Sequence, residues 1–392
     1  MKIINRTVWI LSLVSLFADI ASEMLYPVIP VYLKEIGFSV LLIGVLEGVA
    51  NFIAGLTKGY FGKMSDEKGL RLPFIKSGYF LSAISKPMMA AFTFPIWIFF
   101  ARAIDRFGKG LRTAARDAVL SQNATLQTKA TIFGFHRSMD TLGAAIGPLG
   151  ALCLLLLYPS QYQLIFLVAF IPGLLSVILI FLLKEQKQPV STLQKGNFFS
   201  FLKYWKIASP EYKNLVAGLL LFALFNSSDI FLLLKIRQVT GSDTITISAY
   251  IFYNIVFAAA SYPIGVLADK IGVKKVFITG LLLFAIVYLL FGLTNSTIVI
   301  FIGFLIYGVY AAATEGIAKA WLTNTAHFEN TATAIGFYTS CESICTLLAS
   351  TIAGLLWTLN GSTFTFLLTA CVALMLTVYF KTISTARHKK TI

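Results

Sequence analysis

The stretch GKMSDEKGLR at residues 62–71 returns later in the chain as GVLADKIGVKK at residues 265–275. The shared pattern G-x-x-x-D-x-x-G-x-R/K contains Gly62, Asp66, Gly69 and Arg71 in the first copy and Gly265, Asp269, Gly272 and Lys274 in the second. The copies lie 203 residues apart, and FGFHRSMD (133–140) returns as IGFYTSCE (335–342) after 202 residues. Two matches at nearly one offset predict that the chain is an internal duplication.

The composition predicts a polytopic α-helical membrane protein. The chain has 392 residues, of which 57% are hydrophobic and 12% charged, and its mean hydropathy is +0.81. Apolar segments of about 20 residues, the length that crosses ~30 Å of hydrocarbon, recur throughout. We expect twelve spans, at about residues 7–33, 40–62, 72–92, 95–117, 129–156, 161–183, 213–238, 244–268, 274–293, 296–320, 331–357 and 362–381. A polar cytoplasmic linker at 184–212 divides them into six-helix bundles at 1–183 and 213–392.

The formal net charge is +15, and its distribution argues against nucleic-acid binding. Most Lys and Arg residues fall in short connections on one side of the predicted membrane, which predicts cytoplasmic termini in a bacterial inner membrane. The first apolar segment is expected to be a retained span, because it contains acidic residues and no small-x-small cleavage site. No metal-ligand spacing, phosphate-binding loop or nucleophile–base pattern is present. We therefore expect that the protein is not an enzyme and has no cofactor, and that a gradient of protons or another ion drives it. We also expect a monomer.

Twelve spans, a six-plus-six duplication and the repeated loop pattern resemble the major facilitator superfamily (MFS). The resemblance covers essentially the whole chain. It implies two bundles related by a pseudo-two-fold axis, with a substrate site at the midplane that opens to each side in turn. It also implies that the residues of both loop motifs gate the cytoplasmic side.

GAAIGPLG at residues 143–150 resembles part of the antiporter motif of the same family. Gly143, Gly147 and Pro148 fit that motif, whereas Ala151 and Leu152 stand where its closing glycines are expected. Close helix packing through small residues is the alternative interpretation.

FFARAIDRFGKGLRTAARDAV at residues 99–119 concentrates charge in the predicted fourth span. Its charged residues are Arg102, Asp105, Arg106, Lys109, Arg112, Arg116 and Asp117, which fall within an arc of about 140° on a helix. One charge at the bilayer centre costs ~2.5–3.5 kcal/mol, so this face must meet protein or water. We expect the first four of these residues to line an aqueous cavity. Arg112, Arg116 and Asp117 should reach the cytoplasmic interface, as topology signals or partners of the loop motif.

Acidic residues of the first span supply the opposite charge. Asp19, Glu23 and Tyr26 share one helical face, and Pro27 and Pro30 are expected to kink the span. Carboxylates four residues apart in a low dielectric repel each other, which favours a proton on one of them. Proton coupling is therefore the prediction for Asp19 and Glu23, and neutralisation by the cations of the fourth span is the alternative.

Further polar residues lie on one face of the fifth span. His136 and Asp140 are candidates for proton coupling, as is Asp105 in the fourth span. A hydrogen-bonded core residue is the alternative for His136. The predicted substrate-binding residues are Arg102, Arg106, Lys109, Arg137 and Tyr26.

The predicted function is secondary active transport of an anionic or zwitterionic small organic solute, coupled to protons. A polycarboxylate, its metal chelate or a phosphate-bearing metabolite would suit, because guanidinium groups bind carboxylate and phosphate in a bidentate manner. Alternatives are a drug–proton antiporter and a lysophospholipid transporter. A sensor that binds a ligand without moving it is disfavoured, since only short termini and a linker flank the spans.

Overall fold

A computed structural model describes residues 3–26, 28–186 and 197–383, and these residues form helices and no strands. The helices are α1 (Arg6–Glu23), α2 (Val28–Glu35), α3 (Val40–Lys68), α4 (Leu72–Ala91), α5 (Pro95–Gln122), α6 (Lys129–Leu157), α7 (Tyr162–Ile180), η1 (Phe198–Lys203), α8 (Tyr204–Ile207), α9 (Pro210–Phe225), α10 (Ile230–Thr240), α11 (Asp243–Ile271), α12 (Val273–Leu293), α13 (Thr297–Thr325), η2 (Phe328–Asn330) and α14 (Thr331–Thr382). Part of the predicted linker at 184–212 lies outside the described residues, as does Pro27.

The helices begin and end where the local sequence provides caps. The side chains of Asn5, Ser39, Ser209 and Ser242 each accept a hydrogen bond from the first turn of the helix that follows. Gly69 ends α3 in the left-handed conformation, with φ 59°, which a residue with a side chain adopts at a cost. Gly361, with φ 81°, separates the two predicted final spans within α14.

Seven helical segments within the described residues are long and apolar enough to cross a membrane. Two of them contain more than one element: Pro210–Thr240 contains α9 and α10, which the sequence predicts as one span, and Phe328–Thr382 contains both predicted final spans. The highly charged α5 is not among the seven. Its length of 28 residues would suffice, so its charge is what distinguishes it.

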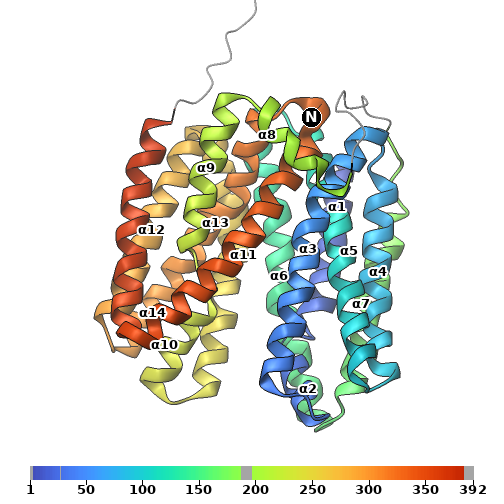
Figure 1. Cartoon of the computed structure of the whole chain (residues 1–392), viewed down its shortest axis with the longest axis vertical. Coiled ribbons are helices and arrows are strands. Elements are labelled where there is room, and N and C mark those ends of the chain that lie inside the picture. Colours follow the sequence, from blue (N-terminus) through green and yellow to red (C-terminus); the bar gives the residue numbers. More distant parts are fainter. Residues whose placement is uncertain (1–2, 27, 187–196, 384–392) are drawn as a thin grey trace, which may run out of the picture. The chain divides into compact units, whose positions relative to one another are not determined.

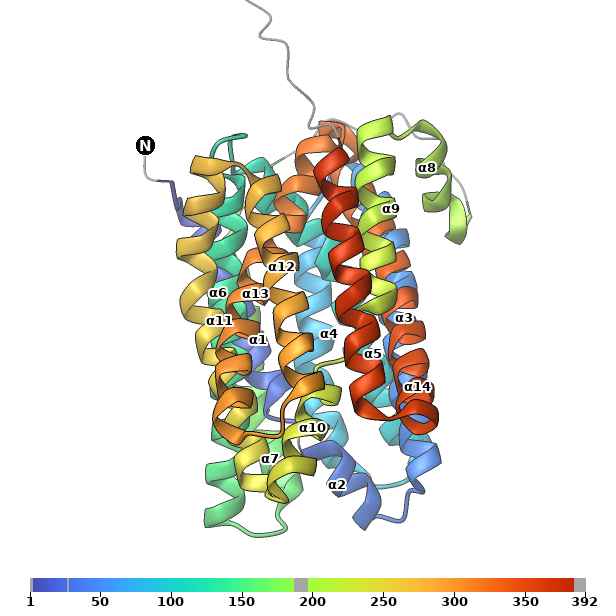
Figure 2. The same ribbon diagram turned by 90° about the vertical axis from the view of Figure 1, so that its left-hand side faces the viewer.

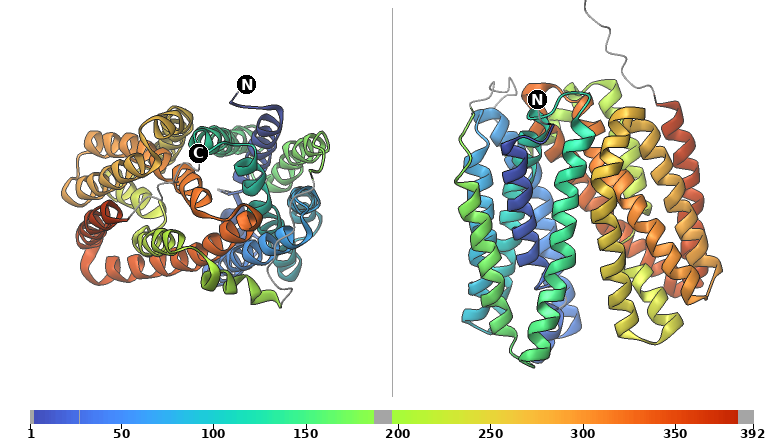
Figure 3. Two further views of the ribbon diagram at one scale, coloured as in Figure 1. Left: turned by 90° about the horizontal axis from the view of Figure 1, so that it is seen from above. Right: turned by 180° about the vertical axis from the view of Figure 1, so that it is seen from behind.

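The chain divides into two compact units, which are described separately. The first comprises the described residues of Met1–Ala124, Phe135–Leu202 and Glu329–Ser343, and the second those of Thr125–Gly134, Lys203–Phe328 and Ile344–Ile392. Within the first, α5 packs between α3 and α4, and α7 packs on α1 and α4 (Figures 1 and 3). Within the second, α13 packs against α11 and α12 (Figure 2). Compared with the predicted bundles, each unit contains a short segment from the other half of the sequence.

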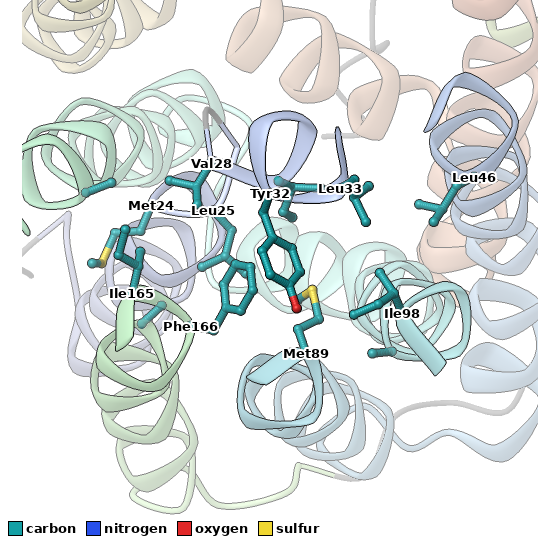
Figure 4. Packing of buried hydrophobic residues seen from close by; sticks show 14 of the residues in the cluster. Met24, Leu25, Val28, Tyr32, Leu33, Leu46, Met89, Ile98, Ile165 and Phe166 are labelled. Atoms are coloured by element: carbon teal, nitrogen blue, oxygen red, sulfur yellow. The ribbon is translucent and has the colours of Figure 1, made fainter. Parts of the chain in front are cut away.

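An apolar cluster packs α2 against α4 and α7 in the first unit (Figure 4). Tyr32 of α2 packs edge-on against Phe166 of α7, with ring centroids 5.0 Å apart, and Met89 of α4 belongs to the same cluster. Met24 and Leu25, which follow α1, are buried there too. In a membrane protein such side chains stabilise through van der Waals packing, so the cluster holds the segment after α1 in place.

The first and seventh predicted spans are interrupted at equivalent positions of the repeat. The first span breaks between α1 and α2, and the seventh between α9 and α10. Both boundaries recur after 202 residues, from Glu23 to Phe225 and from Val28 to Ile230. The second break contains Asn226, Ser227, Ser228 and Asp229. Interrupted helices of this kind expose backbone groups and helix ends inside a membrane protein.

Small residues of α6 allow close approach to α1. A Cβ atom built on Gly143 would lie 2.5 Å from the carbonyl oxygen of Leu16, and one on Gly147 would lie 2.8 Å from that of Ile20. Both distances are too short for a side chain. Within the first unit, these two glycines of GAAIGPLG therefore pack α6 against the backbone of α1.

Replacing Gly143 or Gly147 with alanine is expected to lower the free energy of unfolding by about 1–3 kcal/mol, because the added methyl group overpacks the α1–α6 contact. Gly150→Ala in the same helix is the matched control, since its Cβ would lie 3.8 Å from Met24 Cε and meet no clash. Alanine favours a helix over glycine by about 1 kcal/mol, so the control should be neutral or stabilised. Thermal unfolding in detergent measures the difference. Equal melting temperatures for all three variants would contradict the packing role.

Candidate functional site

A buried ion network connects α4 and α5 within the first unit. The ammonium nitrogen of Lys86 donates to Asp105 Oδ1 at 2.7 Å and to the hydroxyl of Ser22 at 3.3 Å. Arg102 Nη1 lies 3.6 Å from Asp105 Oδ2. Lys86, Arg102 and Asp105 are 1%, 4% and 3% exposed. The structure thus places Arg102 and Asp105 in an enclosed network rather than on an open surface.

A second network joins α5 to α1 and α6. Arg116 binds Asp117 Oδ1, with Nε at 3.0 Å, and donates from Nη1 to the hydroxyl of Ser15 at 3.1 Å. Ser15 donates to Asp140 Oδ1 at 2.5 Å, and Arg137 Nη1 donates to Asp140 Oδ2 at 2.7 Å. Arg116 and Asp117 are buried, so in this unit they form internal contacts.

Arg112 is enclosed by neutral groups of α4. Its Nη1 donates to the hydroxyl of Ser82 at 2.5 Å and lies 3.4 Å from the carbonyl oxygen of Gly78. Its guanidinium carbon lies 4.2 Å from the ring centroid of Tyr79, an arrangement that a cation–π interaction favours. Arg112 is therefore held against α4.

Lys109 and Arg106 are more accessible than the other cations of α5. Lys109 is exposed and Arg106 is partly buried, while Arg102, Arg112 and Arg116 are buried. The ammonium group of Lys109 interacts electrostatically with Asp19, Glu23 and Asp140. On the charged face of α5, the accessible Lys109 thus lies between cations that the protein encloses.

Asp19 connects the acidic face of α1 to α6. Its carboxyl group lies near enough to that of Asp140 for the two to interact electrostatically. Tyr26 is 45% exposed, and the buried His136 lies beside Ser12, with 3.5 Å between Nδ1 and the hydroxyl oxygen.

The first loop motif caps a helix that comes late in the sequence. Asp66, which is fully buried, pairs with Arg71 Nη2 at 2.5 Å. Its Oδ2 also accepts hydrogen bonds from the backbone nitrogen and the hydroxyl of Thr333, both at 2.6 Å. Thr333 belongs to the first turn of α14, whose backbone N–H groups have no partner within the helix. A Cβ on Gly62 would collide with the carbonyl oxygen of Ala332.

The second loop motif does the same within the second unit. Asp269 accepts hydrogen bonds from the backbone nitrogens of Ala130 at 3.0 Å and Thr131 at 2.7 Å, in the first turn of α6. Gly265 lies against Ala130 as Gly62 lies against Ala332. Lys274, in contrast, donates to carbonyl oxygens of Lys381 and Ile383 at 2.9 and 2.6 Å. The two motifs therefore share their capping carboxylate and differ in the partner of the basic residue.

Several contacting residues were absent from the sequence-based prediction. Ser12, Ser15 and Ser22 of α1 recur with Asp19 at spacings of three and four, the period of one helical face, and that pattern could have indicated them. Glu185 accepts hydrogen bonds from the backbone nitrogens of Arg71 and Leu72 at 3.0 and 2.7 Å. Nothing in the local sequence indicates this cap, because its partners lie far away in the chain.

Comparison with known proteins shows that the chain is similar to members of one family. The model of the Major Facilitator Superfamily matches residues 11–256 and 216–391. An MFS-type transporter of Methanocaldococcus jannaschii is 30% identical over 91% of this chain and 90% of its own length. The human organic anion transporter MFSD10 superposes with a TM-score of 0.82 at 16% identity, covering 96% of this chain and 99% of the other. The Escherichia coli fucose:proton symporter gives 0.80 at 12% identity, covering 97% and 98%.

Proposed function

The chain belongs to the Major Facilitator Superfamily, whose members are carriers rather than enzymes, and from this premise we propose that it moves an anionic or zwitterionic small organic solute in exchange or symport with protons. It is a multi-pass integral membrane protein. Alternating access of the two sequence halves is the proposed mechanism. The bias of Lys and Arg residues supports cytoplasmic termini in a bacterial inner membrane.

The exposure of Lys109 is the observation that supports a negatively charged group on the solute. Cations inside a membrane are costly unless they are paired or serve a function. Arg102 and Arg112 are held by groups of the protein, whereas Lys109 is exposed within a span and has Arg106 one turn before it. We assign contact with the negative group of the solute to Lys109 and Arg106, and a positioning role to Arg102. Arg137 is a further candidate, because it is partly exposed beside Asp140.

The proximity of Asp19 and Asp140 supports proton coupling. Two carboxyl groups that lie close together in a low dielectric repel each other, which favours a proton on one of them, and a nearby cation opposes this. Lys109 interacts with both carboxyl groups, so binding of an anion by Lys109 would weaken its attraction to them and favour retention of the proton. Solute binding and protonation would then support each other, as symport requires.

Uptake into proteoliposomes tests both assignments. Under an imposed inward proton gradient, citrate, phosphoenolpyruvate and glycine betaine would be compared as radiolabelled solutes. Lys109→Ala and Arg106→Ala are each expected to lower uptake of the accepted solute roughly 10- to 100-fold, the loss of one charge-assisted contact of about 1.5–3 kcal/mol. Asp19→Asn should abolish the response to the gradient while solute exchange at equal pH continues.

Lys34→Ala is the matched control, because Lys34 is an exposed residue of α2 outside the networks described above. It should transport like the unchanged protein. Uptake that is unaffected by Lys109→Ala and Arg106→Ala would overturn the assignment of the anion site. Transport of lipophilic cations or of lysophospholipid alone would instead support one of the two alternative functions.

A further inference from the structure

Asp229 lies at the break in the seventh predicted span, in the second unit. The break separates α9 from α10, and Asp229 is the residue immediately before α10. Its carboxylate accepts a hydrogen bond from the hydroxyl of Tyr253 on α11 and one from Ser228 at 3.3 Å. Both donors are neutral hydroxyl groups. Both carboxylate oxygens of Asp229 thus act as hydrogen-bond acceptors.

Aromatic rings surround this carboxylate. Tyr253 lies edge-on to Tyr307 and to Tyr250, with 5.4 Å between ring centroids in each pair, and Tyr307 packs on Tyr310 at 5.3 Å. Tyr307 lies close enough to Asp229 to interact with its charge. These rings come from α11 and α13, so the site has walls from two helices besides the break itself.

The charge of Asp229 has no cationic partner among the residues that the structure describes. Asp105, Asp117 and Asp140 of the first unit each form an ion pair, but the contacts of Asp229 are hydroxyl groups and rings. In the same break, Asn226 Oδ1 is buried and finds no hydrogen-bond donor within the described part of the chain. A negative group and an unsatisfied acceptor thus occur together where unpaired polar groups are costly.

We propose that Asp229 and the tyrosines around it bind the ammonium group of an organic solute. An ammonium group neutralises the carboxylate, donates to acceptors such as Asn226 Oδ1, and is attracted by aromatic rings. Asp229 and Tyr250 are partly exposed, so a ligand can reach them. This site lies within the second unit, and the inference goes beyond the proposed function because it adds organic ammonium compounds to the ligands of the protein. A hard metal cation is a poorer fit, since rings replace most of the oxygen ligands that it requires.

Binding of choline and of glycine betaine to the purified full-length protein tests the proposal by isothermal titration calorimetry. Both probes should bind the unchanged protein, and sodium chloride at equal ionic strength should not displace them. Asp229→Asn should weaken choline binding roughly tenfold or more, because the neutral amide keeps the shape and loses the charge. Tyr307→Leu should also weaken it by removing a ring, whereas Tyr253→Phe keeps its ring and should retain most of the affinity.

Lys235→Gln is the matched control. It removes a charge from the same helix, but Lys235 donates to Asn295 at 3.0 Å and takes no part in the Asp229 cluster, so choline binding should be unchanged. Monodisperse elution and an unaltered melting temperature establish that each variant is folded. If Asp229→Asn fails this check, choline binding to Tyr307→Leu tests the proposal instead. Equal choline affinity in the unchanged protein and the folded variants, or no binding to the unchanged protein, would overturn the inference.

The two proposals can fail separately. Anion uptake that depends on Lys109 while choline binds nowhere would overturn the ammonium site and leave the proposed function standing. Choline binding that depends on Asp229, in a protein whose transport ignores Lys109, would support the ammonium site and overturn the assigned anion site.

Discussion

Asp105→Ala is expected to destabilise the protein by about 3–5 kcal/mol, the cost of leaving buried charges without their partner. Lys86 and Arg102 would both lose the carboxylate that lies 2.7 and 3.6 Å from them, and neither can reach solvent in place. The melting temperature in detergent and the fraction of protein that elutes as a monodisperse peak are the measurements. The accompanying loss of transport should follow the loss of folded protein.

A neutral replacement of the pair separates charge from packing. Asp105→Leu combined with Lys86→Met removes both charges and keeps apolar volume, so the double variant should recover much of the stability that Asp105→Leu alone loses. Lys34→Met is the control for removing an exposed lysine. If Asp105→Ala melts at the same temperature as the unchanged protein, the α4–α5 network contributes little to stability.

Asp66→Ala should have a comparably large effect, and a larger one than Asp269→Ala. Asp66 holds the buried guanidinium of Arg71 as well as two groups of Thr333, so its removal strands a charge and uncaps α14. Asp269 accepts hydrogen bonds from backbone N–H groups of α6 and has no part in holding Lys274, which donates to other partners. We expect about 3–5 kcal/mol for Asp66→Ala and about 1–2 kcal/mol for Asp269→Ala.

Lys68→Ala controls for the loss of a charged residue beside the motif. Lys68 is exposed and its ammonium group lies 6.0 Å from the ring centroid of Phe74, so its removal should cost no more than about 1 kcal/mol. Thermal unfolding of the three variants side by side gives the order directly. Equal losses for Asp66→Ala and Asp269→Ala would show that the ion pair with Arg71 adds nothing to the cap.

The family and the class of fold could be predicted from the sequence, because they depend on periodic and repeated features. Spans of about 20 apolar residues and the repeated loop motif are sequence patterns, so they can be recognised without knowing which residues are in contact. The family match and the solved structures confirm this prediction. The helix break at 226–229 was not predicted, since it contains no proline and its polar residues could equally have faced a neighbouring helix.

The enclosure of individual charges could not be predicted. The helical period places Arg102, Arg106 and Lys109 on one side of α5, but it does not say which of them meets Asp105 and Lys86 and which meets open space. That distinction depends on Lys86 of α4, which stands in an otherwise apolar part of that helix. Likewise, the pairing of Asp140 with Arg137 follows from their spacing on one helix, whereas its contact with Ser15 depends on how closely two glycines let α1 and α6 approach.

The cap on α14 also bears on the order in which the molecule is made. Asp66 emerges from the ribosome 267 residues before Thr333, the residue that it binds. During synthesis, the first half must therefore enter the bilayer with an acid–guanidinium pair whose helix partner does not yet exist. Insertion of the last two spans would complete that site, so maturation of the early half depends on the end of translation.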